Sequence, residues 1–119
     1  MGKQVDQWVQ QLNDLMVLIR RPFAFRVHQA IRSYVANYPD QSEDGAKTAV
    51  ADQIEQKILP KFRGLDPADQ GAVQALTRLT ALLGELGDSQ LVHAVEENRR
   101  SGEHLFVWQG VDRMAQEGI

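Results

Sequence analysis

Apolar residues recur every three or four positions along most of the chain, which is the spacing of one face of an α-helix. The clearest case runs from Val5 to Ile19. This helix should end near Arg21, because Pro22 cannot continue the hydrogen-bond ladder and disfavours helical dihedrals in the residue before it. The residue-by-residue alternation of a half-buried strand is missing. We therefore expect an all-α fold, a bundle of four to five helices.

Prolines and capping residues place the next boundaries. The second helix should have Pro22 at or near its first turn and end at Pro39. A polar loop follows, and Ser42 or Asp44 is expected to cap the third helix. That helix should close at Pro60.

The sequence Asp66-Pro67-Ala68-Asp69 is a strong start signal for a fourth helix. We expect Asp66 to be the capping residue, with proline at the first helical position and Asp69 as an acid in the first turn. This helix should stop at Gly87. A fifth should cover residues 88–102. The segment 105–108 is too short to assign, and a strand, an extended tail and a continued helix all remain open.

The composition is that of one globular domain. With 119 residues, 43% hydrophobic and 24% charged, the chain can build a core of its own, so we treat residues 1–119 as a single helical domain. Neither a membrane-length apolar run nor the apolar block of a signal peptide is found in the sequence, which favours a cytoplasmic protein without a membrane partner. The absence of cysteine excludes disulfides and thiol nucleophiles.

The sequence offers little for catalysis or metal binding. His28, His93 and His104 each stand alone, without the spacing that puts two imidazoles on one helix face, and we expect them to face solvent or to cap helices. We find neither a nucleophile elbow nor a phosphate-cradling glycine loop. We therefore expect no catalytic residue, no metal site and no cofactor belonging to this chain. Trp8 and Trp108 lie in apolar runs, which favours the core, although an exposed tryptophan could instead meet a partner.

Four arginines lie within 13 residues at the junction of the first two expected helices, and the nearest acids along the chain are Asp14 and Asp40. Guanidinium groups fork onto phosphate oxygens, and a helix start adds free N–H groups, so the cluster suits a polyanion. The alternative is that the arginines only cover apolar surface and keep the chain soluble. The four residues are Arg20, Arg21, Arg26 and Arg32.

A second basic group, Lys57, Lys61 and Arg63, follows the third expected helix in the sequence QKILPKFRG. Lys57 near a helix C-terminus complements the helix dipole, so part of this group needs no ligand. Together with Arg20, Arg21 and Arg32, these residues are candidate contacts to phosphate or to a partner.

The run LNDLMVLIRRPFAFRVHQAIRSYV, followed after a loop by IEQKILPKFRG, resembles the C-terminal helical lid of AAA+ nucleotide triphosphatases of the restriction-associated McrB type. The similarity covers roughly residues 8–64, and residues 102–108 are more weakly similar to the closing glycine-aromatic-tryptophan segment of that family. The matching elements are Leu12 to Met16, Phe25-Arg26-Val27, Ile31, Tyr34-Val35, and Lys57 to Lys61 with Gly64.

The resemblance implies a role in nucleotide sensing. Such lids pack over a nucleotide on a core α/β domain, and Arg26 matches the arginine that points at the γ-phosphate as sensor 2. The implied ligand of the full-length protein is ATP or GTP with magnesium. The implied partners are the core ATPase domain of the same longer chain and neighbouring ring subunits.

The chain lacks the phosphate loop and the magnesium-binding acids of such an ATPase, so it is not expected to hydrolyse nucleotide alone. We expect an excised C-terminal domain of a longer ATPase, with a free-standing relative of the lid as the other interpretation. A different hypothesis is a small helical module that binds nucleic acid or an acidic protein through its arginine cluster.

Overall fold

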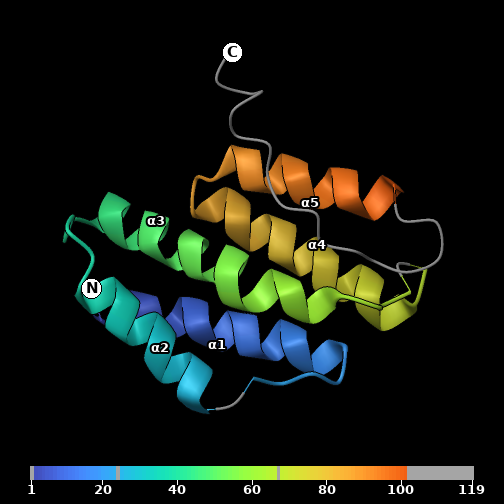
Figure 1. The fold of residues 1–119 in the computed structure, drawn as a ribbon, viewed down its shortest axis with the longest axis horizontal. Coiled ribbons are helices and arrows are strands. Elements are labelled where there is room, and N and C mark those ends of the chain that lie inside the picture. Colours follow the sequence, from blue (N-terminus) through green and yellow to red (C-terminus); the bar gives the residue numbers. More distant parts are fainter. Residues whose placement is uncertain (1, 24, 67, 102–119) are drawn as a thin grey trace.

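The computed structural model describes residues 2–23, 25–66 and 68–101, and these residues form five α-helices around one apolar core (Figure 1). Within these ranges no residue is in a strand, and the predicted all-α bundle is confirmed. The helices are α1 (Gly2–Leu18), α2 (Phe25–Ala36), α3 (Glu43–Gln53), α4 (Gln70–Glu85) and α5 (Ser89–Ser101).

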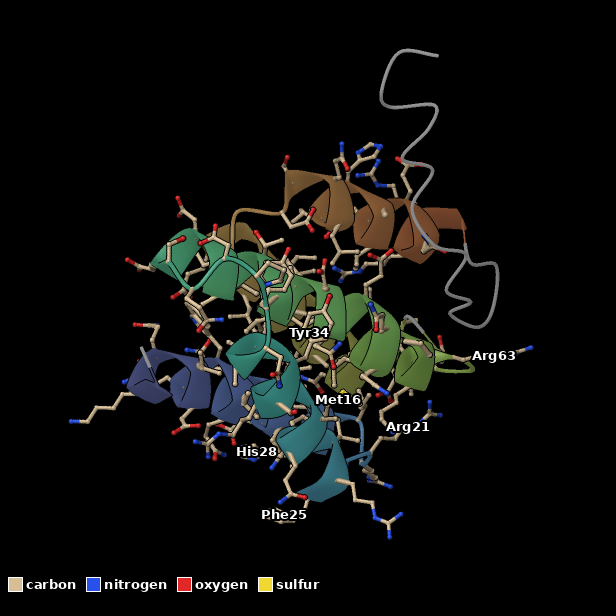
Figure 2. The ribbon with its side chains drawn as sticks, turned by 60° about the vertical axis from the view of Figure 1, so that its left-hand side comes forward. Met16, Arg21, Phe25, His28, Tyr34 and Arg63 are labelled. Atoms are coloured by element: carbon tan, nitrogen blue, oxygen red, sulfur yellow. The ribbon has the colours of Figure 1, made fainter. Side chains whose placement is uncertain are left out.

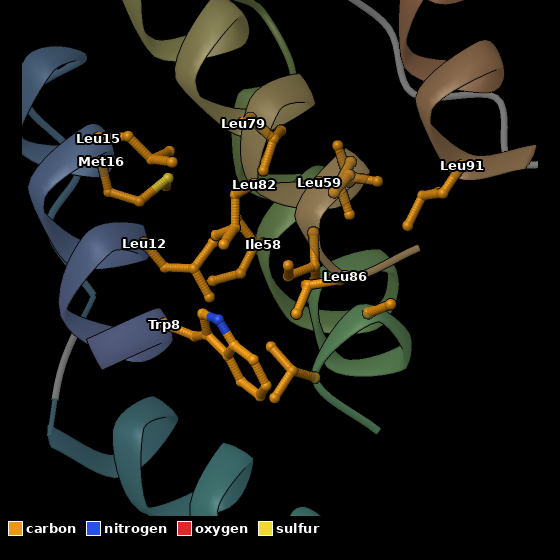
Figure 3. Close-up of a cluster of buried hydrophobic side chains, with 14 of the residues drawn as sticks. Trp8, Leu12, Leu15, Met16, Ile58, Leu59, Leu79, Leu82, Leu86 and Leu91 are labelled. Carbon is orange, nitrogen blue, oxygen red and sulfur yellow. The ribbon is translucent and has the colours of Figure 1, made fainter. Parts of the chain in front are cut away.

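Helix α4 packs against both α1 and α5, while α2 contacts α1 and α3. The core between these helices is built from the apolar stripes that the sequence pattern predicts (Figure 3). Trp8 is 1% exposed, and its Nε1 donates to Oε1 of Glu85 at 3.4 Å, so it belongs to the core as the sequence favoured. The labelled core residues are Trp8, Leu12, Leu15, Met16, Ile58, Leu59, Leu79, Leu82, Leu86 and Leu91.

The connection between α1 and α2 is longer than expected. Helix α1 ends at Leu18, and Arg20 has a φ of 60°, which reverses the chain before Pro22. Helix α2 then begins at Phe25, so the prediction that Pro22 lies in its first turn is wrong. Pro22, with its fixed φ, therefore lies in the connection between the two helices and not in the first turn of α2.

Helix α3 does not simply close at Pro60. It continues as a π-helical turn, η1 (Ile54–Ile58), and then as a 3-10 turn, η2 (Leu59–Phe62). The backbone N–H of Leu59 reaches back to the carbonyl of Ile54, five residues earlier. Because Pro60 has no N–H to donate, the regular ladder cannot pass it, and the helix ends in irregular turns.

The start of α4 also differs from the prediction. The capping residue is Asp69, whose side chain accepts from the N–H of Ala72 at 3.2 Å. Asp66 instead accepts from the N–H of Ala68 at 2.9 Å, in a turn outside the helix. Both aspartates have capping chemistry, and the local turn decides which of them meets the helix.

Other helix ends follow the sequence. Ser42 caps α3 by accepting from the N–H of Gly45 at 3.2 Å. Gly87 follows α4 with a φ of 80°, a conformation that favours glycine. Asp88 accepts from the N–H of Leu91 at 2.9 Å at the start of α5.

Among the described residues, no helix is long and apolar enough to cross a membrane. His104, Trp108 and the segment 102–108 lie outside the described residues.

Candidate functional site

The two basic segments of the sequence meet in the fold, 40 residues apart along the chain. Nη1 of Arg21 donates to the carbonyl oxygen of Lys61 at 2.5 Å and to that of Arg63 at 2.8 Å. Arg21 itself is half-buried, and both Arg21 and Arg63 are labelled on the same side of the ribbon in Figure 2. The turn after α1 is therefore tied to the end of η2.

Helix α2, which begins with Phe25 and Arg26, packs against α3. The hydroxyl of Tyr34 donates to Oδ2 of Asp52 at 3.0 Å, and one turn earlier Ala30 lines a groove with Lys57. Residues four apart share a helix face. Arg26, one turn before Ala30, lies on the same face at the N-terminal end of α2.

We name the region where Arg21 meets η2 the basic end. It combines the turn after α1, the last turn of η1 and the end of η2. Its members are Arg20, Arg21, Lys57, Lys61 and Arg63, and Arg26 lies outside it, at the start of α2.

Arg32 does not belong to the basic end, although the sequence groups it with the other arginines. It lies six residues beyond Arg26, about 9 Å along α2. Its Nε is 3.4 Å from Oδ1 of Asp6 on α1, and both side chains are about half exposed. Such a surface pair contributes at most about 1 kcal/mol, but it directs Arg32 toward α1.

Residues 15–39 and 56–65 hold seven of the chain's thirteen Lys and Arg residues and none of its sixteen Asp and Glu residues. The nearest acids after the second stretch are Asp66, which accepts a backbone N–H in the turn before α4, and Asp69, which caps α4. A chain of net charge −3 thus carries a concentrated positive region. A field of this kind attracts anions.

Arg26 is exposed and is the second residue of α2. In the part of the chain that the structure describes, no carboxylate lies within ion-pair distance of it. Its neighbour Phe25 is 72% exposed, an unusual position for a large apolar ring. The start of α2 thus presents a free cation beside an exposed aromatic side chain.

The histidines differ in their surroundings. His93 is exposed, whereas His28 is half-buried, and its Nε2 has no hydrogen-bond partner among the described residues. The His28 ring lies 6.5 Å from that of Phe25. Across residues 2–23, 25–66 and 68–101, no group of three His, Asp or Glu side chains is placed to hold a metal ion.

A groove of about 660 Å³ separates α2 from α3 and η1. Its wall includes the π-helical turn, which the sequence did not predict, and two tyrosine rings with centroids 5.8 Å apart. Burial and the hydrogen bond to Asp52 raise the pKa of Tyr34 above its ordinary value. The groove-lining side chains include Tyr34, Tyr38, Gln53, Gln56 and Lys57.

A family model described as "Domain of unknown function (DUF8727)" matches residues 1–115. The chain belongs to the DUF8727 family. The match spans all five helices and both basic segments, so the basic end lies entirely within the DUF8727 domain. Neither a curated protein nor a solved structure matches this DUF8727 chain.

Proposed function

We propose that the chain is the C-terminal lid domain of a AAA+ ATPase of the McrB-like type and that Arg26 is its sensor-2-like arginine. The observation that carries the proposal is the position of Arg26: exposed, in the first turn of α2, and without a carboxylate partner among the described residues. The order of elements from Leu12 to Gly64, which resembles such lids, supports it.

The electrostatics of the first turn support an anionic ligand at this position. A helix N-terminus carries partial positive charge and normally favours Asp or Glu, yet the first turn of α2 has no acid and contains Arg26. A cation there is opposed by the helix dipole, and a bound phosphate would relieve both charges. The guanidinium can bind two phosphate oxygens at once.

In this proposal the nucleotide is ATP or GTP with magnesium, held by the core domain of a longer chain, and neighbouring ring subunits are further partners. The lid alone is not catalytic. Phe25 and Val17, 72% and 54% exposed, are the large apolar side chains near the α1–α2 connection that such a core domain would cover. A cytoplasmic location fits this role.

The test replaces Arg26 in the intact longer protein. Arg26→Ala should lower the turnover of nucleotide hydrolysis by at least about tenfold, because a guanidinium facing the transferred phosphoryl group contributes through transition-state charge. Folding should be unchanged, since the side chain is exposed. Arg78→Ala, at an exposed arginine of α4, is the matched control.

Unchanged turnover in Arg26→Ala would remove this residue from the nucleotide site. The reading frame upstream of Met1 provides a second check, because the proposal requires that it encode a glycine-rich phosphate loop and acidic magnesium ligands. A stop codon directly before Met1 would count against the lid interpretation.

A further inference from the structure

Nucleotide sensing uses one arginine, and the basic end contains more. Arg20 and Arg63 are exposed and Lys61 is half-buried, and none of the three has an ion-pair partner in the described ranges. Surface cations on an acidic protein normally lie among carboxylates. These lie where two acid-free stretches of sequence meet. Asp66 and Asp69 are nearby, but both carboxylates accept backbone N–H groups, and neither forms an ion pair with these cations in the described ranges.

The backbone at Arg20 ends α1. Its φ of 60° is the left-handed conformation, and the N–H groups of Arg20 and Arg21 donate to the carbonyls of Val17 and Met16, as is common after the last turn of a helix. Asparagine adopts this conformation as well, so the turn does not depend on the guanidinium. The exposed Arg20 side chain is therefore not needed for the turn and is available to a ligand.

Arg21 explains how the cations are held together. Its guanidinium occupies the carbonyls of both Lys61 and Arg63, which fixes the backbone at the residues whose side chains extend outward. Both hydrogen bonds come from the single nitrogen Nη1, which donates one N–H to each carbonyl. A lysine ammonium lies one bond closer to the main chain and should reach the two carbonyls less well. Arg21 is therefore a positioning residue for its neighbours.

We propose that the basic end binds the sugar-phosphate backbone of a nucleic acid, with Arg20, Lys61 and Arg63 as phosphate contacts and Arg21 as the residue that positions them. The proposal does not depend on the lid interpretation. Arginine forks match phosphate oxygens, and several neighbouring cations without ion-pair partners among the described residues match a ligand that repeats its charge.

A nucleic acid fits better than an acidic protein because of Phe25. This ring is 72% exposed at the start of α2, next to Arg26 and four residues after Arg21 along the chain. An exposed aromatic ring beside cations can stack on an unpaired base, which favours single strands over duplex. A polyglutamate chain offers no base for it.

The experiment measures binding of the full chain to a fluorescent single-stranded oligonucleotide and to its duplex, by anisotropy, at 50 and 200 mM salt. Three phosphate contacts should weaken binding to the single strand roughly twentyfold between these concentrations. The single strand should bind more tightly than the duplex, and unlabelled polyglutamate should compete poorly.

The variants distinguish residues that contact phosphate from the residue that positions them. Arg20→Asn tolerates the left-handed turn, and Arg63→Gln keeps the carbonyl that Arg21 uses, so each should fold, weaken binding several-fold and lower the salt slope by about one. Arg21→Lys keeps the charge and should weaken binding at an unchanged slope. Arg78→Gln removes an exposed arginine of α4 and should change neither quantity.

Absence of oligonucleotide binding at low salt would overturn the proposal, as would an equal loss in Arg78→Gln or effective competition by polyglutamate. Circular dichroism of each variant verifies the fold. Failure here leaves the hydrolysis test of Arg26 untouched, because Arg20 and Arg63 have no part in that test.

Discussion

The guanidinium of Arg21 donates to the carbonyl oxygen of Arg63 at 2.8 Å, although 42 positions separate the two residues (Figure 2). The backbone N–H of Arg63 donates to the carbonyl of Pro60 at the end of η2, and the chain then leaves the helix. Carbonyls at such an end have no helical N–H partner. Arg21 supplies an N–H donor from a distant segment. This contact brings the two basic stretches side by side.

Loss of the two hydrogen bonds from Arg21 should destabilise the fold. Arg21→Met keeps much of the aliphatic stem but leaves the carbonyls of Lys61 and Arg63 without their donor, and we expect a loss of about 1–2 kcal/mol in the free energy of unfolding. Urea denaturation followed by circular dichroism measures it. Arg63→Gln is the control and should cost less than about 0.5 kcal/mol, because its side chain is exposed. Equal losses in the two variants would contradict the assigned role.

Two glycines of α4 should respond oppositely to alanine. A Cβ on Gly71 would lie 2.5 Å from the carbonyl oxygen of Leu18, so the backbones of α1 and α4 would have to separate. A Cβ on Gly84 would meet nothing within 4 Å. We expect Gly71→Ala to cost about 1–3 kcal/mol, as overpacking does, and Gly84→Ala to gain about 0.5–1 kcal/mol from helix propensity.

Thermal and urea unfolding of both glycine variants check this expectation. The pair controls for the substitution itself, because both residues lie in the same helix and gain the same methyl group. Stabilisation of similar size at both positions would mean that helix propensity, and not the close approach to Leu18, decides the outcome.

The two aspartates before α4 provide a test of capping. Asp69→Ala removes the oxygen that accepts from the N–H of Ala72 and should cost about 1 kcal/mol. Asp66→Ala removes only a turn contact to Ala68 and should cost clearly less. The urea midpoints of the two variants measure these losses. A larger loss in Asp66→Ala than in Asp69→Ala would mean that Asp66 is the capping residue.

The apolar spacing alone predicts the helices and the burial of Trp8, because a stripe on a helix must find a core. It cannot choose between Asp66 and Asp69, since both have the right chemistry and the choice depends on how the chain enters α4. The pairing of Arg21 with the end of η2 is likewise beyond local pattern. Two features of the sequence were consistent with a basic surface at this point: the two stretches without Asp or Glu, and Pro60, which marks where the helix must end.

The last prediction concerns the alkaline stability of the α2–α3 contact. Burial, the hydrogen bond to Asp52, and the charges of Asp52 and Tyr38 all raise the pKa of Tyr34 above its ordinary 10.0. The fold therefore favours the neutral phenol. Its contribution to stability is complete below pH 10 and is lost as the pH rises through the higher pKa of the native state.

Tyr34→Phe should accordingly cost about 0.5–1.5 kcal/mol near neutral pH, because the hydrogen bond to Asp52 is lost. Above pH 10 the wild-type free energy of unfolding should fall more steeply than that of the variant, and the two should converge. Asp52→Asn keeps an acceptor oxygen but removes the charge, so tyrosinate absorbance should show a smaller rise in the Tyr34 pKa. Parallel alkaline stability curves for wild type and Tyr34→Phe would show that this hydroxyl does not titrate with folding.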